Sequence, residues 1–134
     1  MKLLYAVLCE DAGERMDGRL DVHGIFHQLY APGFPAAQDR LTLAMAVEWD
    51  PGERGKIEFS IELMDPSQSP VLSITGHTDV SDQGPLQGPP QTRLLMPLEN
   101  VMFPAEGTYA FELVVGGERQ RIAPLHLIKD TGMN

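Results

Sequence analysis

The 134-residue sequence contains a single cysteine, Cys9. One cysteine cannot form a disulfide within the chain, and it cannot build a zinc site from several thiolates. A chain of this length does not need such cross-links, because about two thirds of its unfolded surface becomes buried on folding. The cysteine count is typical of a reducing compartment, so we expect a cytoplasmic protein with one domain over residues 1–134.

Long apolar runs are also missing. None approaches the roughly 20 residues that a membrane-spanning helix needs. The opening MKLLYAVLCED resembles a lipoprotein leader, because one lysine precedes an apolar run that ends in cysteine. That run is short, however, and Leu8 stands before Cys9 where a cleavage site needs small residues. We therefore expect neither a cleaved leader nor a membrane anchor.

Basic residues are few. The chain has 10 Lys and Arg against 19 Asp and Glu, a net charge of -9, and the basic residues are scattered apart from Arg119 and Arg121. Proteins bind nucleic acids and anionic membranes through clustered Lys and Arg that displace counterions from phosphates. The composition thus argues against both kinds of partner, and the acidity favours solubility.

The sequence is instead rich in short segments whose apolar residues recur at every second position. In KIEFSIELM, the side chains of Ile57, Phe59 and Ile61 share one face, which is the pattern of a half-buried strand. No segment of comparable length has a helical period. Eight strands are predicted, at residues 2–9, 19–30, 41–49, 56–64, 71–80, 92–99, 108–115 and 118–128.

Turn residues separate these strands. Asp17-Gly18 and Gly116-Gly117 tolerate the positive φ that tight hairpin turns require. Strands at this spacing without helices predict an all-β fold, an antiparallel β-sandwich of about eight strands. The strand at 2–9 is apolar on both faces, so it is either central or covered by a loop. We expect residues 31–40 to cross between the sheets and the Pro/Gly-rich residues 81–91 to form a mobile loop.

One segment adds a resemblance. VMFPAEGTYAFELVVGGE, residues 101–118, resembles the last hairpin of many bacterial immunoglobulin-like sandwiches. Tyr109 looks like the tyrosine corner of those folds, whose hydroxyl bonds to backbone a few residues upstream. Phe111 stands where antibody domains have a cysteine, which removes the disulfide between the sheets.

The resemblance extends over nearly the whole chain. With YAVLCEDA near the start, GIF at 24–26, FP at 34–35 and APLHL near the end, the chain is similar to a family of short bacterial all-β proteins of unknown function. This implies an immunoglobulin-like sandwich and no activity.

His23 and His27 stand four apart in LDVHGIFHQLY, residues 20–30. On a helix this spacing would place two metal ligands on one face. Here Val22 and Phe26 are predicted to face the core of a strand, with Gly24 marking a bulge or a close backbone approach. Positions four apart on a strand are separated by about 13 Å, too far to share a zinc ion about 2.0 to 2.1 Å from each ligand.

A mixed metal site remains open, in which one of these histidines meets His77 or His126 across the sheet, with Asp21 or Asp79. The simpler interpretation is histidines on the polar face of a sheet. No metal and no cofactor is expected.

The acidic residues near the N-terminus suggest a second site. Asp11, Glu14 and Asp17 lie close in sequence but lack the EF-hand spacing. They are candidates for a loop at the sandwich end that binds calcium or a small polar molecule, and otherwise form an ordinary polar hairpin loop.

Nothing predicts catalysis. A G-x-S-x-G elbow and a Gly-rich phosphate loop are absent, and Cys9 lies in an apolar strand, where burial makes a thiol unreactive. We therefore expect a non-catalytic binding or assembly module with an unknown protein partner or self-association. Tyr30 and Phe34 are the candidates for an interaction surface, or else they cap the core. An open edge strand is the other route, to a second copy or an extended peptide.

Overall fold

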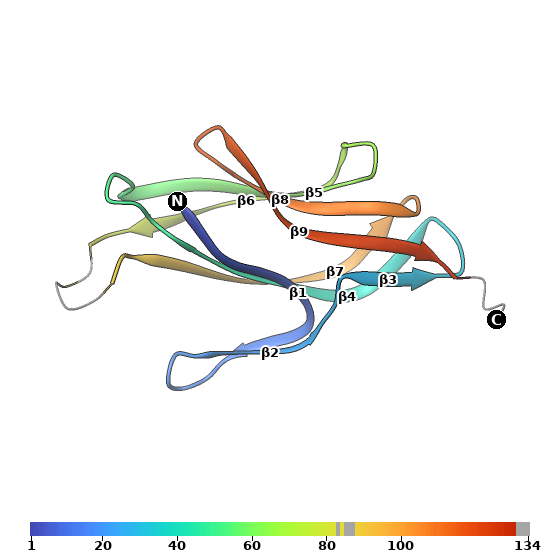
Figure 1. Ribbon diagram of the computed structural model, residues 1–134, viewed down its shortest axis with the longest axis horizontal. Helices are drawn as coiled ribbons and strands as arrows, with labels where there is room; N and C mark the ends of the chain where they lie inside the picture. Colours follow the sequence, from blue (N-terminus) through green and yellow to red (C-terminus); the bar gives the residue numbers. More distant parts are fainter. Residues whose placement is uncertain (83, 85–87, 131–134) are drawn as a thin grey trace.

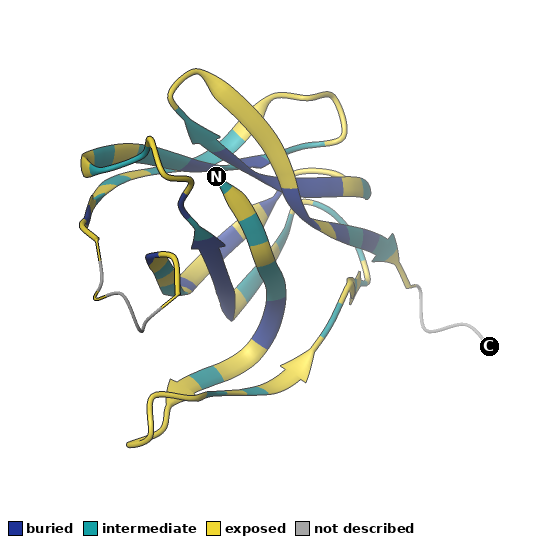
Figure 2. Ribbon diagram, turned by 60° about the vertical axis from the view of Figure 1, so that its left-hand side comes forward, coloured by how far each residue is buried: buried dark blue, intermediate teal, exposed yellow. Residues whose placement is uncertain are grey.

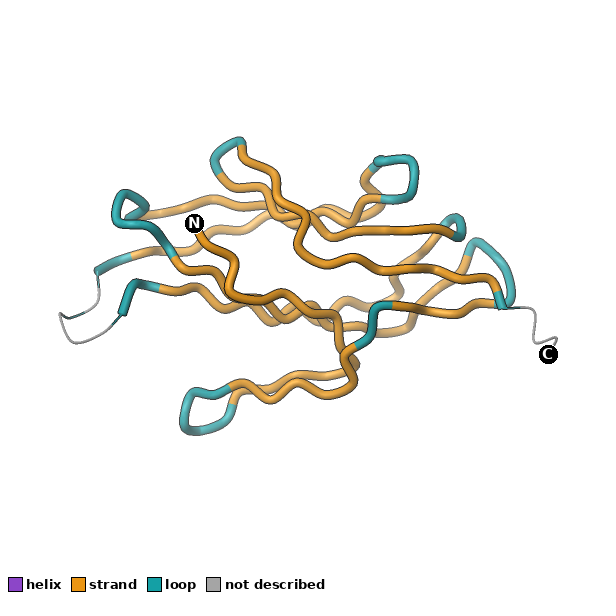
Figure 3. Tube along the Cα trace, viewed as in Figure 1, coloured by secondary structure: helices purple, strands orange, loops and turns teal. Residues whose placement is uncertain are grey.

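The computed structural model describes residues 1–82, 84 and 88–130, and these residues form two β-sheets. Figures 1 and 3 show the two sheets face to face. The strands are β1 (Lys2–Glu14), β2 (Leu20–Ile25), β3 (Gln28–Ala31), β4 (Ala36–Glu48), β5 (Gly55–Met64), β6 (Pro70–Val80), β7 (Gln91–Phe103), β8 (Gly107–Val115) and β9 (Glu118–Lys129). The prediction of an all-β sandwich is confirmed.

The first sheet has the order β2-β1-β4-β7 and the second the order β3-β9-β8-β5-β6. Neighbouring strands are antiparallel except β3 and β9, which pair in parallel from Gln28 opposite His126 to Ala31 opposite Lys129. In the first sheet β1 lies between β2 and β4, as its two apolar faces predict. In the part of the chain that the structure describes, the two sheets have four edge strands, β2, β7, β3 and β6.

The core lies between the sheets and follows from the period-two pattern. Leu41, Leu43 and Met45 on β4 face Ile61 and Leu63 on β5, and all five side chains are almost completely buried. Strand residues alternate between faces, so each strand contributes every second side chain to this layer. The outer face of β4 is buried as well, through Thr42, Ala44 and Ala46.

The prediction of one strand over residues 19–30 is wrong. The segment forms β2 in the first sheet and β3 in the second, with Phe26 and His27 between them. Gly24 has a left-handed φ of 68°, where a Cβ would lie 2.7 Å from the side chain of Glu10. The close neighbour of Gly24 is thus a side chain and not the backbone that the predicted close backbone approach requires, and the chain then changes sheets. The prediction of eight strands becomes nine in the described residues.

The connection at 31–40 also differs in extent. It crosses from β3 in the second sheet to β4 in the first, as predicted, but only residues 32–35 lie outside strands. The Phe34-Pro35 peptide bond is cis. Of the predicted mobile loop at 81–91, residues 83 and 85–87 lie outside the described residues.

The hairpins have the turn residues that the sequence indicates. Gly116 and Gly117 have φ of 56° and 85° and join β8 to β9 as a two-residue turn. The turn at Asp17-Gly18 is longer, since Arg15 N donates to Arg19 O at 2.7 Å and Gly18 N to Arg15 O at 2.9 Å. This is a type I turn followed by a left-handed glycine with φ of 86°.

Tyr109 makes the predicted link to upstream backbone. Its hydroxyl donates to Ala105 O at 2.7 Å and accepts from Ala105 N at 3.1 Å. The ring is fully buried and meets Phe103 edge to face, with ring centroids 5.1 Å apart. The bonds fix the loop between β7 and β8 against the core.

Candidate functional site

A β-hairpin projects from the first sheet. It consists of residues 10–25, the second half of β1 with β2, and we call it the arm. Figures 1 and 2 show the arm as a two-stranded ribbon that diverges from the sandwich and is largely exposed. Register pairs run from Cys9 opposite Ile25 to Glu14 opposite Leu20.

The tip of the arm is tied back to the far side of its own sheet. Arg93, on edge strand β7, donates through Nη1 to Glu14 Oε1 at 3.2 Å and to Gly18 O at 2.9 Å. In the first sheet Arg93 lies opposite Ala46, which in turn lies opposite Tyr5. The arm therefore folds over the outer face of the sheet that it belongs to.

Between the arm and that face lies an open groove of about 530 Å³. Tyr5 and Val7 line it from the sheet, and apolar side chains line it from the arm. The charged lining residues are Arg19 and Arg93, both basic. The full lining is Tyr5, Val7, Arg19, Leu20, Val22, Ile25 and Arg93. The groove is thus apolar with a basic rim.

The prediction that Val22 faces the core is wrong. Val22 is half-buried and lines the groove, outside the cluster of core residues, whereas Phe26 packs against the core as predicted. The periodicity identifies the apolar face of the segment, but that face points to the outer surface of the first sheet because the arm folds back. Ile25 is 52 % exposed, so the arm also presents apolar surface to solvent.

The two candidates for an interaction surface lie in different environments. Tyr30, on edge strand β3, is 61 % exposed, and its hydroxyl donates to Gln28 Oε1 at 2.8 Å. Phe34 is partly buried and packs against the core, in the position of a cap. Tyr30 is therefore accessible to a partner and Phe34 is largely not.

The acidic candidates each have different neighbours. Glu14 pairs with Arg93, and Asp17 receives a hydrogen bond from Arg19 N at 3.0 Å. Asp17 also lies 3.5 Å from Arg15 Nη2. Asp11 lies opposite His23 in the arm ladder. In the described part of the chain, no group of three or more His, Cys, Asp or Glu is placed to hold a metal ion.

The four histidines are distributed over both sheets. His23 is on β2, His27 is in the crossing between the sheets, and His77 is on β6 opposite Glu58. His126 on β9 lies 3.1 Å from Thr108 Oγ1 through Nδ1.

Cys9 is completely buried, with its Sγ 3.5 Å from Thr42 O. Burial, and to a smaller extent the charge of Asp11, raises the pKa of its thiol. A thiol that resists ionisation is a poor nucleophile, as the sequence predicts.

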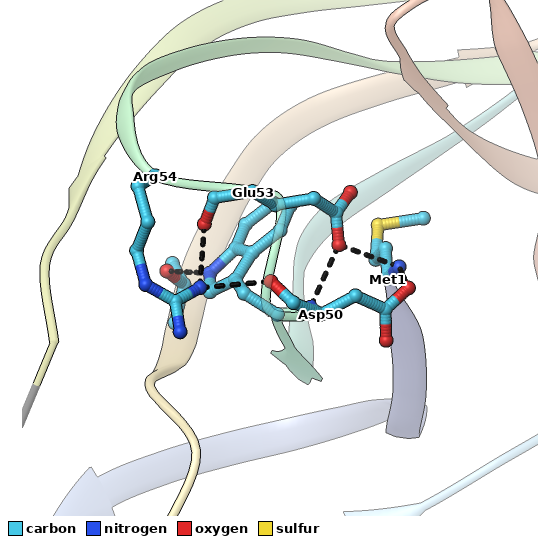
Figure 4. Close-up of polar contacts among 6 residues, drawn as sticks. Met1, Asp50, Glu53 and Arg54 are labelled. Atoms are coloured by element: carbon cyan, nitrogen blue, oxygen red, sulfur yellow. Dashed lines mark hydrogen bonds and ion pairs between the residues drawn. The ribbon is translucent and has the colours of Figure 1, made fainter.

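A charged cluster closes the opposite end of β1. The Met1 amino group lies 2.5 Å from Asp50 Oδ2 and 2.7 Å from Glu53 Oε1, and these hydrogen bonds raise its pKa. Figure 4 shows both carboxylates around the amine and Arg54 on the other side of the same turn, where it donates to Asp50 O at 2.8 Å. This cluster fixes the loop between β4 and β5.

The sequence does not identify the residues of the groove as candidate site residues, and among them it singles out only Val22, as a core residue. Arg93 belongs to a strand more than 70 positions from the arm tip, and its contacts with Glu14 and Gly18 arise only in the folded chain. The only sequence signal was the apolar outer face of the first strand, Tyr5 and Val7 included.

Within residues 1–82, 84 and 88–130, no helix has the length and apolarity to cross a bilayer. No curated protein matches the chain. The sequence model of a family of unknown function, DUF6941, matches residues 4–128, in agreement with the resemblance to a family of unknown function. The chain therefore belongs to the DUF6941 family of unknown function.

Proposed function

We propose that this protein is a non-catalytic, cytoplasmic binding module with an immunoglobulin-like sandwich, and that it contacts protein partners through the arm. The observation that carries the proposal is the apolar groove between the arm and the first sheet. Apolar surface that remains outside the core and is rimmed by polar residues is typical of interaction sites. The fully buried, unreactive Cys9 supports both a reducing compartment and the absence of thiol catalysis.

The arm combines two features that favour a protein over a small molecule. Its apolar lining residues, Leu20, Val22 and Ile25, belong to the edge strand β2. An edge strand offers unpaired backbone groups to an extended chain, and the side chains beside it provide selectivity. The charged residues that line the groove, Arg19 and Arg93, are both basic, and this favours acidic over basic partners.

The test is a pull-down from the native cell at low and high salt, with two matched variants. Ile25→Lys places a charge in the groove, and Met102→Lys places the same charge at an equally exposed apolar position on β7, since Ile25 is 52 % and Met102 53 % exposed. We expect a partner that the wild type and Met102→Lys retain and Ile25→Lys loses. A partner retained equally by all three, or no partner at either salt concentration, would contradict the proposal.

The alternative of a calcium or small polar ligand at Asp11, Glu14 and Asp17 stays a prediction. A ligand bound only by the native state raises Tm. If calcium binds at these residues, millimolar calcium should raise Tm. An unchanged Tm would rule out the calcium site.

A further inference from the structure

We propose that the free edge of β2 pairs with β2 of a second copy, antiparallel and centred on Val22, so that the two arms form one continuous sheet. The inference rests on the proposed function in that it names a second copy as a partner of the arm. It is carried by the hydrogen-bond phase of the arm and by the positions of Asp21 and His23 on its edge strand.

The phase follows from the turn at the arm tip. Arg15 N donates to Arg19 O at 2.7 Å, and bonded pairs recur at every second position of an antiparallel ladder. With the observed register, Asp21 and His23 direct their backbone groups towards β1. Leu20 and Val22 therefore direct their N–H and C=O groups to the free edge. The phase changes after Val22, since Gly24 has a φ of 68° and Phe26 N donates to Leu8 O at 2.9 Å.

A two-fold axis through Val22 uses the outward N–H and C=O groups of that residue. Val22 of one copy then bonds to Val22 of the other, and Leu20 of each copy lies opposite Gly24 of the other. The same surface serves both copies, which is the self-complementary condition for a symmetric dimer. The half-buried Val22 side chains meet on the apolar face of the two arms.

Side chains that can hydrogen-bond to each other lie opposite in this register. Asp21 of one copy lies opposite His23 of the other, twice, and both side chains are exposed. These are the non-hydrogen-bonded positions of the new ladder, where Cα atoms are about 4.5 Å apart and side chains are closest. Within each arm His23 also faces Asp11, and Asp21 lies 3.9 Å from Arg15 Nε. His23 is thus placed between two carboxylates in the dimer.

The pairing is expected to be weak. A six-residue strand buries much less than the roughly 1,200 Å² of a stable interface, and each copy carries a net charge of -9. Association should appear at concentrations of about 0.1 to 1 mM in about 0.15 M salt, where charges beyond about 8 Å are screened.

Sedimentation equilibrium of charge variants tests the register. His23→Asp replaces two attractive contacts with two repulsive ones and should weaken the dimer about tenfold, since opposed like charges destabilise strand pairs. Asp21→Lys combined with His23→Asp places opposite charges across from each other and should recover the dimer. His77→Asp is the matched control, because His77 also lies opposite an acidic residue, Glu58, and the net charge changes equally. It should leave the dimer unchanged.

A thiol crosslinker provides a second readout that does not depend on charge. Val22→Cys places the two thiols across the axis, with Cα atoms about 5.5 Å apart. Leu20→Cys separates them by about 13 Å along the strands, so a short reagent should join only the first variant. Cys9 is completely buried and does not compete.

A wild-type protein that stays monomeric at about 1 mM, a dimer insensitive to His23→Asp, or equal crosslinking of both cysteine variants would overturn the pairing. Such a result would leave the pull-down through Ile25 unaffected, so failure of the dimer and failure of the proposed function are distinguishable.

Discussion

The Tyr109 hydroxyl and the backbone of Ala105 are joined by two hydrogen bonds, of 2.7 Å to the carbonyl oxygen and 3.1 Å from the amide nitrogen. Because the phenol ring is fully buried, its hydroxyl needs hydrogen-bond partners within the protein, and the backbone of Ala105 provides them. They connect the loop after β7 to the centre of the second sheet.

Tyr109→Phe should lower the free energy of unfolding by about 1 to 3 kcal/mol, because it removes two hydrogen bonds that contribute about 0.5 to 1.5 kcal/mol each. Tyr30→Phe is the control, since it removes a hydroxyl bond to Gln28 at an exposed position and should change stability by less than about 0.5 kcal/mol. Urea unfolding measures both. Equal effects would show that the bonds to Ala105 contribute nothing specific.

Gly24→Ala should destabilise the protein by about 1 to 2 kcal/mol, the usual cost of a left-handed φ for a residue with a Cβ. The added carbon would also lie 2.7 Å from the flexible Glu10 side chain, which must move. Gly13→Ala is the control within the same arm, because no atom lies within 4 Å of its Cβ position. Equal unfolding free energies for the two variants would contradict the role of Gly24.

Residues 56–64 and Tyr109 show what the sequence predicts well. The alternation in KIEFSIELM predicts residues 56–64, and β5 occupies Gly55–Met64. Tyr109 was identified from a local motif, and its hydrogen bonds are local as well. Where the periodicity and the turn residues agree, the strand forms as expected.

The arm shows what the sequence could not predict. The alternation in residues 19–30 is real, but Gly24 and the change of sheet at Phe26 and His27 divide the segment in two. The groove depends on the contact of Arg93 with Glu14, a long-range pair without a local signal. A pattern of apolar residues specifies a face of a strand, and only the folded chain determines what lies opposite that face.

The stability of the folded chain should fall as pH rises above about 8. The Met1 amine has a raised pKa in the folded state, mainly through hydrogen bonds to Asp50 and Glu53. Because this pKa is higher in the folded than in the unfolded chain, the charged amine stabilises the fold fully at pH values below its unfolded pKa, about 7.7 to 8.0. This stabilisation is lost as pH rises through the folded pKa.

The double variant Asp50→Asn with Glu53→Gln isolates this effect. Cys9 and Tyr109, whose pKa values burial raises, titrate in both proteins, so the difference between the two curves belongs to the amine cluster. Urea unfolding from pH 7 to 10 should show the two proteins converging at high pH. A constant difference over this range would contradict the assignment.

Arg93→Ala should loosen the arm without unfolding the sandwich. The variant loses the bonds to Glu14 and Gly18 that hold the arm tip, and local opening then costs less free energy. Hydrogen exchange should accelerate at the amides of residues 15–19 and stay unchanged in β8. The control is Arg54→Ala, which breaks the contact with Asp82 and should not affect the arm. Unchanged exchange at 15–19 in Arg93→Ala would show that the arm holds its position without the hydrogen bonds of Arg93.

Photo-crosslinking in the native cell tests whether the arm is the binding element. A reactive side chain is placed at Val22, in the arm, and separately at Thr75, an exposed position on β6. If the arm is the binding element, Val22 gives discrete protein adducts, with a second copy or another protein, and Thr75 does not. If Val22 gives no adduct, or the same adducts as Thr75, the arm is not the surface through which this protein acts.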